Sequence, residues 1–289
     1  MLKKTSILVS FLLCFTIICT SCTNHRKADR TENLKIISYN VWVGYIDVES
    51  KQRLPLYHSG EKRKEGIYKW LKEQNSDVIF FQELIDYSGD KLMSESRFWG
   101  HKYAVTLRDS GMAIGFSSKY PIEVKEILTE GMHHGLIYCS ILGVDIIGTH
   151  LWPRFDEKIV DEVKIVGKRV SESLTKENPV IVLGDFNAFS PQDDPYIDST
   201  TIKLYRDWWK WKLENGRPSY RVVQELLDLG MKDVCVKFDK NNVARKQRYD
   251  FIFASPELVE KCTDATHYQD EEFLKLSDHF PVSAEFELK

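Results

Sequence analysis

Short apolar runs that end or begin in a polar residue are the feature that most restricts how this chain can fold. Runs of this length predict buried strands. All of the polar residues can meet at one rim only if the sheets are mixed or antiparallel, which disfavours a doubly wound parallel fold. The runs with a polar residue at their end are 34–39 before Asn40, 77–81 before Gln82 and Glu83, 144–149 before His150 and 179–183 before Asp185, and those with one at their start are 251–253 after Asp250 and 281–288 after Asp278 and His279.

Amphipathic helices are predicted between these strands. Apolar residues recur at helical spacing in 62–74, 160–174 and 219–229, and Gly230 is suited to end the last helix. Nothing in the chain repeats at a period of about 20–50 residues. We therefore expect one large domain over 34–289, built from two sheets packed face to face with helices outside.

The first residues read as an export signal. Lys3 and Lys4 precede the apolar stretch 7–19, which is shorter than the roughly 20 residues of a membrane span. The residues before Cys22 resemble the processing site of a bacterial lipoprotein, although Cys19 stands where leucine is usual. We expect 1–21 to be a signal peptide that is removed, and Cys22 to be lipidated.

The expected location is the bacterial cell envelope, with the acyl chains of Cys22 in a membrane and 22–33 as a polar tether. Plain secretion and an uncleaved anchor are the alternatives. Loss of residues 1–21 removes two lysines and no acid, so the formal net charge changes from −3 to −5. Such a chain is not expected to bind DNA tightly and nonspecifically, so nucleic acid is considered only as a substrate. We expect a monomer.

The later cysteines do not form a zinc motif, because Cys139, Cys235 and Cys262 lack the paired spacing of such sites. Cys139 lies in the apolar run 136–142 and is predicted to be a buried thiol. Whether Cys235 and Cys262 form a disulfide in an oxidising envelope stays open.

The polar residues at the strand ends supply the parts that metal-assisted phosphoester hydrolysis requires. Each alone has a plainer explanation, such as a turn residue or a histidine at a strand edge. A hard cation needs oxygen ligands, which Glu83, Asn40 and Asp278 offer. Proton transfer from water needs a base, for which His279 is suited if Asp250 fixes its tautomer.

Three further residues complete this set. Asn187 and His150 are suited to donate hydrogen bonds to the charged phosphoryl oxygens of the transition state. Asp185 either orients the water or takes its proton, and the sequence does not separate these roles.

The motifs around these residues resemble, in order, those of the endonuclease/exonuclease/phosphatase superfamily, which is DNase I-like. The resemblance covers about residues 33–288. It implies an α/β fold, a four-layer sandwich of two mixed, mainly antiparallel sheets flanked by helices. It also implies magnesium or manganese at Glu83, with calcium as an alternative, His279 paired with Asp250, and His150 with Asn187 at the phosphate. The motifs lie at 38–42, 82–83, 111–114 with 118–122, 148–151, 184–188, 248–253 and 277–282.

The resemblance to the superfamily does not identify the substrate. Relatives that cleave DNA usually carry a Tyr or Arg that reaches the nucleic-acid backbone, and Tyr103 and Arg108 are the nearest candidates. Trp152 is a further candidate for substrate binding. The pair His133-His134 lies between two predicted strands and is interpreted as exposed and outside the site.

The 189–218 segment, which follows the Asp185 motif, is expected to decide substrate choice. Leu204, Trp208 and Trp211 share a helical face and predict an amphipathic helix docked on the body. Trp209 falls off that face. With Lys210, it is suited to stack on a base or sugar, or to rest at a lipid headgroup.

We therefore expect an enzyme, a divalent-metal-dependent phosphodiesterase that acts on nucleic acid or on a phospholipid or sugar-phosphate ester. The alternative is a binding protein that kept the fold and lost catalysis. The presence of Glu83, Asp185, Asn187, Asp278 and His279 together argues against that alternative.

Overall fold

The computed structural model describes residues 33–45, 59–238 and 248–289. The chain divides into a unit of Met1–Arg30, which lies outside the described residues, and a unit of Thr31–Lys289. The predicted signal peptide, Cys22 and the tether as far as residue 32 therefore lie outside the described part. Within that part, no helix combines the length and apolar character needed to cross a membrane.

Two six-stranded sheets form the body. Among their neighbouring strands only β1–β2 and β7–β8 are parallel, and the other described pairs are antiparallel. The prediction of mixed, mainly antiparallel sheets is confirmed. Sheet A has the order β11 (Cys262–His267), β12 (Val282–Glu287), β1 (Asn33–Asn40), β2 (Val78–Ile85), β4 (Met112–Ser118) and β3 (Tyr103–Thr106). Sheet B has the order β5 (Glu123–Leu128), β6 (Leu136–Ile141), β7 (Val144–His150), β8 (Val180–Asp185), β10 (Asp250–Ala254) and β9 (Lys232–Asp233).

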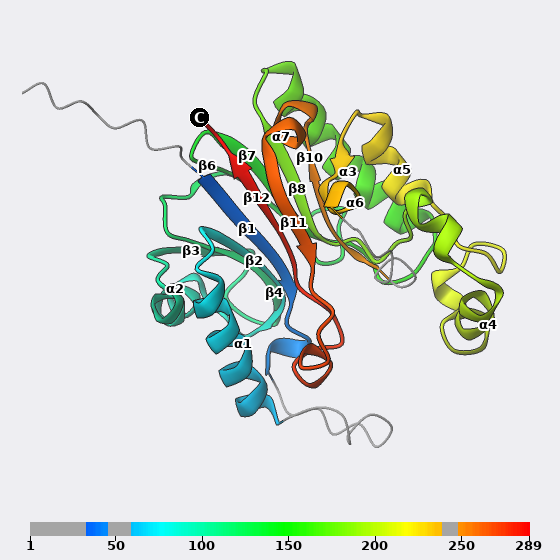
Figure 1. Ribbon diagram of the computed structural model, residues 1–289, viewed down its shortest axis with the longest axis horizontal. Coiled ribbons are helices and arrows are strands. Elements are labelled where there is room, and N and C mark those ends of the chain that lie inside the picture. Colours follow the sequence, from blue (N-terminus) through cyan, green and yellow to red (C-terminus); the bar gives the residue numbers. More distant parts are fainter. Residues whose placement is uncertain (1–32, 46–58, 239–247) are drawn as a thin grey trace, which may run out of the picture. The chain divides into compact units, whose positions relative to one another are not determined.

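Helices cover the outer faces of both sheets (Figure 1). The three predicted helices are present as α1 (Gly60–Gln74), α3 (Glu157–Thr175) and α5 (Arg221–Asp228), and Gly230 has the positive φ expected after a helix end. The other α-helices are α2 (Gly89–Ser96), α4 (Ser199–Trp208), α6 (Val234–Phe238) and α7 (Pro256–Lys261). Short 3-10 turns are η1 (Val43–Tyr45), η2 (Arg97–Trp99), η3 (Pro191–Tyr196), η4 (Lys210–Lys212) and η6 (Phe273–Lys275).

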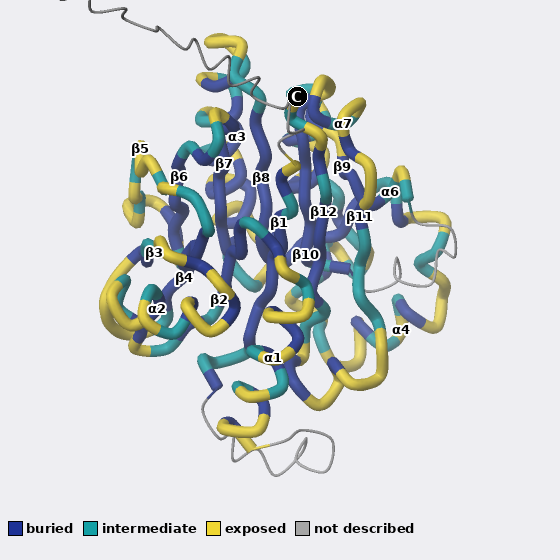
Figure 2. Tube along the Cα trace, turned by 60° about the vertical axis from the view of Figure 1, so that its left-hand side comes forward, coloured by how far each residue is buried: buried dark blue, intermediate teal, exposed yellow. Residues whose placement is uncertain are grey.

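Three apolar clusters separate these four layers. Ile36, Phe80 and Leu183 belong to the cluster between the sheets, which also holds the three described cysteines. A second cluster joins α3 and α5 to sheet B, and a third joins α1 and α2 to sheet A. Figure 2 shows the buried strands between more exposed helices and loops. The described cysteines are all buried and none forms a disulfide, which answers the question left open for Cys235 and Cys262.

The strand directions bring the polar strand ends to one rim. Asp185 at the end of β8 is opposite both His150 of the parallel β7 and Asp250 of the antiparallel β10. In sheet A, Asn40 at the end of β1 pairs with Gln82 of the parallel β2. The rim therefore forms as the sequence predicts.

Gly184 allows the approach of β7 and β8 beside Asp185. Its φ is 141°, and a Cβ atom at this position would lie 1.8 Å from the carbonyl oxygen of Thr149. Backbone atoms cannot yield to such an overlap, so only glycine fits at this position.

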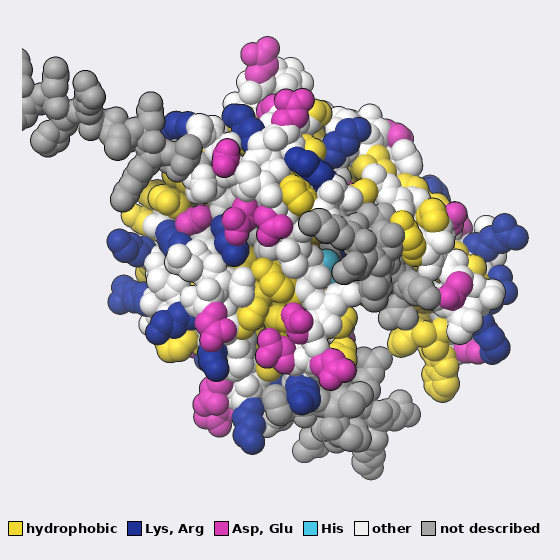
Figure 3. All heavy atoms as spheres, in the orientation of Figure 1, with side chains coloured by type: hydrophobic (Ala, Val, Ile, Leu, Met, Phe, Trp, Pro, Cys, Tyr) yellow, Lys and Arg dark blue, Asp and Glu magenta, His cyan; other side chains and the backbone are white. Residues whose placement is uncertain are grey.

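The 189–218 segment packs in a different way from the prediction. Thr201 and Tyr205 are the buried residues of α4, whereas the side chain of Trp208 is 69% exposed and that of Trp211 is 44% exposed. The predicted docking face of Leu204, Trp208 and Trp211 is therefore wrong. Figure 3 shows hydrophobic and basic side chains together at the surface where Figure 1 has α4.

Candidate active site

A β-bulge and a left-handed backbone place Glu83. The β2–β4 register shifts between Phe81 and Leu84, and Glu83 within this bulge has a φ of 60°. The sequence suggested that the strand ends before Glu83, but β2 continues to Ile85. Bulges redirect a side chain out of the alternating pattern of the strand. Here the bulge turns the carboxylate toward the end of β1.

Glu83 and Asn40 form the oxygen-rich corner of the rim. The Nδ2 of Asn40 donates to Glu83 Oε1 at 3.1 Å and to Asp185 Oδ2 at 3.2 Å. The backbone N–H of Val43 donates to Glu83 Oε2 at 2.8 Å. An ionised carboxylate has about four acceptor positions, so Glu83 keeps capacity for a cation while these bonds fix its orientation.

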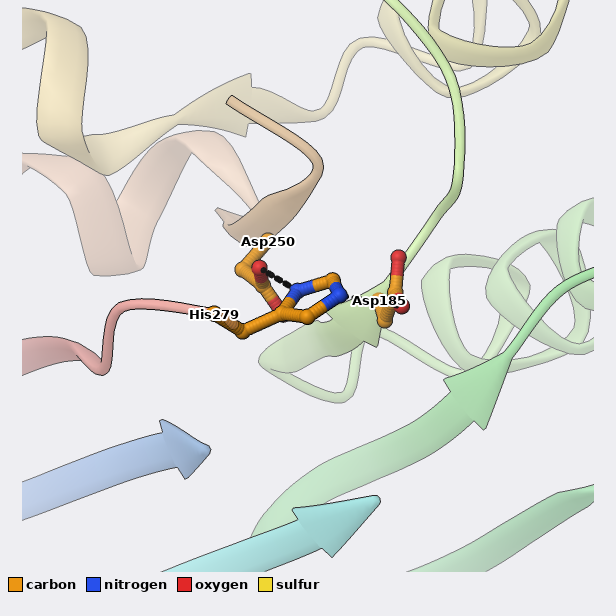
Figure 4. A group of neighbouring side chains, drawn as sticks. All are labelled: Asp185, Asp250 and His279. Atoms are coloured by element: carbon orange, nitrogen blue, oxygen red, sulfur yellow. Dashed lines mark hydrogen bonds and ion pairs between the residues drawn. The ribbon is translucent and has the colours of Figure 1, made fainter. Parts of the chain in front are cut away.

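His279 lies between two buried carboxylates (Figure 4). Its Nδ1 is 2.7 Å from Asp250 Oδ2, and its Nε2 is 3.6 Å from Asp185 Oδ2. Ser277 fixes the approach of this residue, because its Oγ accepts from the His279 N–H and donates to the carbonyl of Asn40. The predicted pairing of His279 with Asp250 thus corresponds to a direct contact.

The charges of this group shift its pKa values. Burial alone would lower the pKa of His279, but Asp250 and Asp185 outweigh burial and raise it well above its usual range. Burial raises the pKa of Asp250 to about 6, although His279 acts in the opposite direction. Burial opposes ionisation of Asp185 as well, yet His279 and His150 keep its pKa below the usual value. The His279–Asp250 pair therefore holds a proton at neutral pH beside an ionised Asp185.

His150 connects Asp185 to a stack of rings. Its Nε2 lies 3.3 Å from Asp185 Oδ2, and its ring stacks on that of His134 with centroids 3.9 Å apart and planes 10° apart. His133 contacts His134 edge to face, and also Trp152 at 4.4 Å. The interpretation that this histidine pair lies outside the site is therefore wrong for His134. Burial, with His150 and His133, lowers the pKa of His134 to about 2, so its ring is neutral.

Glu162 of α3 is a residue that the sequence did not indicate. It is fully buried and accepts from two backbone N–H groups, that of His133 at 2.7 Å and that of Trp152 at 2.8 Å. Burial raises the pKa of its carboxyl group. Through these bonds, Glu162 holds the loop before β6 against the loop after β7.

Asn187 has a left-handed backbone with a φ of 50°, and its N–H donates to Asp185 Oδ1 at 2.8 Å. Its side-chain Nδ2 donates to the carbonyl of Leu151 at 3.0 Å. Its Oδ1 accepts from the ammonium group of Lys212. Lys212 is a second residue that the sequence did not indicate, and it comes from the 189–218 segment.

The remaining predicted residues occupy different places. Arg108 is exposed and its charge acts on His133 and His134, so it lies on the site side. Tyr103 pairs with Ser118, which pairs with Val78 at the start of β2. It therefore lies at the other end of sheet A from Glu83, which speaks against a part for Tyr103 in this site.

Three further predicted residues, Asp278, Trp209 and Lys210, do not take part in the hydrogen bonds described above. Asp278 is exposed, and its charge acts on His279 and on Lys212. Trp209 packs against Tyr205 with centroids 5.7 Å apart, and Lys210 is exposed. Lys212, two residues after Lys210, is the side chain of this turn that contacts Asn187.

Comparison with known proteins identifies the family. The model of the endonuclease/exonuclease/phosphatase family matches residues 37–279. An AP endonuclease from Archaeoglobus fulgidus superposes with a TM-score of 0.63 at 23% identity, over 88% of this chain and 100% of that one. A 3′ phosphatase from Neisseria bound to a product DNA hairpin superposes with a TM-score of 0.62 at 21% identity, over 88% and 99%. No curated protein sequence matches the chain significantly.

Structural similarity at 21–23% sequence identity shows a shared fold. The family model matches most of the residues, and the chain therefore belongs to the endonuclease/exonuclease/phosphatase family.

Proposed function

We propose that this protein is a phosphoester hydrolase, a phosphodiesterase that uses a divalent metal ion. The observation that carries the proposal is the meeting of two groups at one rim. One is the oxygen-rich pair Asn40 and Glu83, and the other is Asp185 with His279 and Asp250. The first suits a hard cation and the second suits proton transfer from water.

The donor set of the first group fits magnesium or manganese, with calcium as an alternative. Glu83 and Asn40 would hold the ion, and exposed Asp278 would add charge nearby. Asp185, Asp250 and His279 also lie close enough together to hold an ion, with ligand atoms within 4.8 Å of one another. We favour Glu83, because His279 and Asp250 already satisfy each other at 2.7 Å. A bound ion would polarise a phosphoryl oxygen and offset developing charge.

The other residues position the reactants. Ionised Asp185 would orient the attacking water molecule. If His279 stays protonated during the reaction, Asp185 is the group that accepts the proton of this water. His150, at 3.3 Å from Asp185, would lie beside the phosphoryl oxygens of a substrate bound at this rim. The Nδ2 of Asn187 donates one of its two N–H groups to the carbonyl of Leu151. The contact of its Oδ1 with Lys212 supports a role at the phosphate.

The substrate is proposed at the level of chemical class. The similar structures include an AP endonuclease and a 3′ phosphatase bound to product DNA, which supports a nucleic-acid ester. The predicted lipid anchor at Cys22 and the exposed tryptophans of the 189–218 segment support a phospholipid or sugar-phosphate ester instead. DNA, RNA, sphingomyelin, phosphoinositides and simple phosphate esters, each assayed with magnesium, manganese and calcium, distinguish these classes. If the protein binds one of these compounds but hydrolyses none, the result would favour the alternative that it is a binding protein without catalytic activity.

The test of metal-dependent hydrolysis is Glu83→Gln. We expect turnover to fall roughly 100-fold or more, because a metal ion supplies several kcal/mol of transition-state stabilisation. Binding of Mn²⁺, measured by titration calorimetry, should weaken in parallel. Glu123→Gln, at an exposed position of β5, is the matched control and should change neither quantity. Unchanged turnover in Glu83→Gln, or full activity of the wild type in excess chelator, would contradict the proposal.

A further inference from the structure

Lys212 brings a positive charge from the 189–218 segment into the catalytic site. Its ammonium group donates to Asn187 Oδ1 and lies 4.4 Å from the centre of the Tyr249 ring. The carboxylates whose charges act on it are Asp185, Asp250, Asp278 and Glu83. Lys212 thus lies among the residues assigned above to metal binding and proton transfer.

The backbone holds the turn that carries Lys212. The carbonyl of Trp211 accepts from the N–H of Phe155 at 2.7 Å, and the N–H of Lys212 donates to the carbonyl of Trp209 at 2.8 Å. The next residue, Leu213, is buried with Phe189 and Tyr205. The side chain therefore extends from a fixed turn, not from a loose surface loop.

Arg248 fixes the beginning of the same segment. Its guanidinium forms hydrogen bonds to both carboxylate oxygens of Asp193 and an ion pair with Asp233 at 2.6 Å, and all three side chains are buried. The hydroxyl of Tyr249 donates to that of Tyr205 in α4. The segment is thus joined to β9 and β10 on the rim side, next to Asp250.

The surroundings of Lys212 favour an anion as its partner. An ammonium group has three donors, and the bond to Asn187 occupies one of them. Lys212 is half-buried, so its ammonium has lost part of its hydration. Burial also lowers its pKa to about 8 despite the four nearby carboxylates. A cation that has lost water binds an anion more strongly than one at the surface.

We propose that Lys212 binds a nonbridging phosphate oxygen of the substrate and holds the amide of Asn187 beside it. The proposal rests on the proposed function, and it assigns the phosphate-binding cation of the site to the 189–218 segment. The competing explanation is that Lys212 only balances the charge of the carboxylates. Lys212→Arg would replace a mere counter-charge in full, whereas it would restore the proposed hydrogen bond only in part, so the two explanations predict different results.

The test uses inorganic phosphate as the probe, because its binding does not depend on turnover. Phosphate and Mn²⁺ affinities are measured by titration calorimetry for the wild type, Lys212→Met and Lys212→Arg. Lys176→Met, at an exposed lysine just after α3 and outside the site, is the matched control. We expect Lys212→Met to bind phosphate about 10- to 100-fold more weakly, the loss of one charge-assisted hydrogen bond, with Mn²⁺ binding equal or tighter. Lys212→Arg should recover part of the affinity, and Lys176→Met should behave as the wild type.

Two results would overturn the proposal. One is unchanged phosphate affinity in Lys212→Met, and the other is a wild type that does not bind phosphate either with or without Mn²⁺. Melting temperatures identify a variant that fails to fold, in which case Lys212→Gln gives the same readout. Failure of the proposed function is distinguishable, because it would appear as an absence of hydrolysis in a wild type that still binds phosphate through Lys212.

Discussion

His279 and Asp250 are joined by a 2.7 Å contact and share one proton, so neither residue has an independent role in proton transfer. We predict that His279→Ala and Asp250→Asn each lower kcat/KM by about 10²- to 10⁴-fold, the range typical of general acid–base catalysis. The double variant should be no slower than the slower single variant, because either change removes the pair. A cycle of the four proteins measures this coupling. If the two losses simply add on a logarithmic scale, the residues work separately.

Residues near a strand end could be found from the sequence, whereas residues that depend on loop packing could not. Asn40, His150, Asp185 and Asp250 follow from apolar runs and their boundaries. His134, Glu162 and Lys212 carry no such local signal. His134 and Lys212 contact His150 and Asn187, which are 16 and 25 positions away, and Glu162 accepts from N–H groups 29 and 10 positions away. Their roles emerge only from the folded arrangement.

At the scale of elements, α3 controls two loops of the site through a single carboxylate. We predict that Glu162→Gln lowers kcat/KM by about 10-fold, because the amide has only one oxygen for the N–H groups of His133 and Trp152 and the stack on His150 loosens. An unsatisfied buried N–H costs about 1–3 kcal/mol, so the melting temperature should also fall. The imidazole NMR signals of His134 report the loss of stacking independently of stability.

Glu172→Gln is the matched control for this prediction, since Glu172 is an exposed carboxylate on the same helix. It should leave activity, melting temperature and the His134 signals unchanged. If Glu162→Gln lowers the melting temperature and leaves kcat/KM and the His134 signals as they are, Glu162 serves stability alone.

The errors at the scale of elements have local physical causes. The face predicted for Leu204, Trp208 and Trp211 assumes one continuous helix, but α4 ends at Trp208 and Trp211 belongs to the separate turn η4. Helical spacing therefore does not relate these residues. Tyr103 is misplaced for a different reason: the pairing register of β3 decides which end of the sheet it occupies, and register depends on partners distant in sequence.

At the scale of the whole described unit, β1 separates the entry of the chain from the site. Asn33 at the start of β1 pairs with Glu287 near the carboxyl terminus, whereas Asn40 at its other end contacts Glu83 and Asp185. An eight-residue strand spans about 25 Å at roughly 3.3 Å per residue. The first described residue, Asn33, thus lies at the end of β1 away from the catalytic residues.

This arrangement leads to a prediction about the anchor. Cys22→Ser should release the protein from membranes or stall its processing, because residues 1–21 resemble a signal that is removed at Cys22. Membrane fractionation and the mass of the amino-terminal fragment measure this outcome.

Activity of the released protein on a small soluble phosphodiester should equal that of the anchored protein, since the site lies at the end of β1 away from Asn33. A Cys22→Ser protein that stays membrane-bound and is cleaved normally would require a different anchor. A released protein that loses activity on the soluble ester would instead mean that the site depends on the membrane, contrary to its placement at the end of β1 away from Asn33.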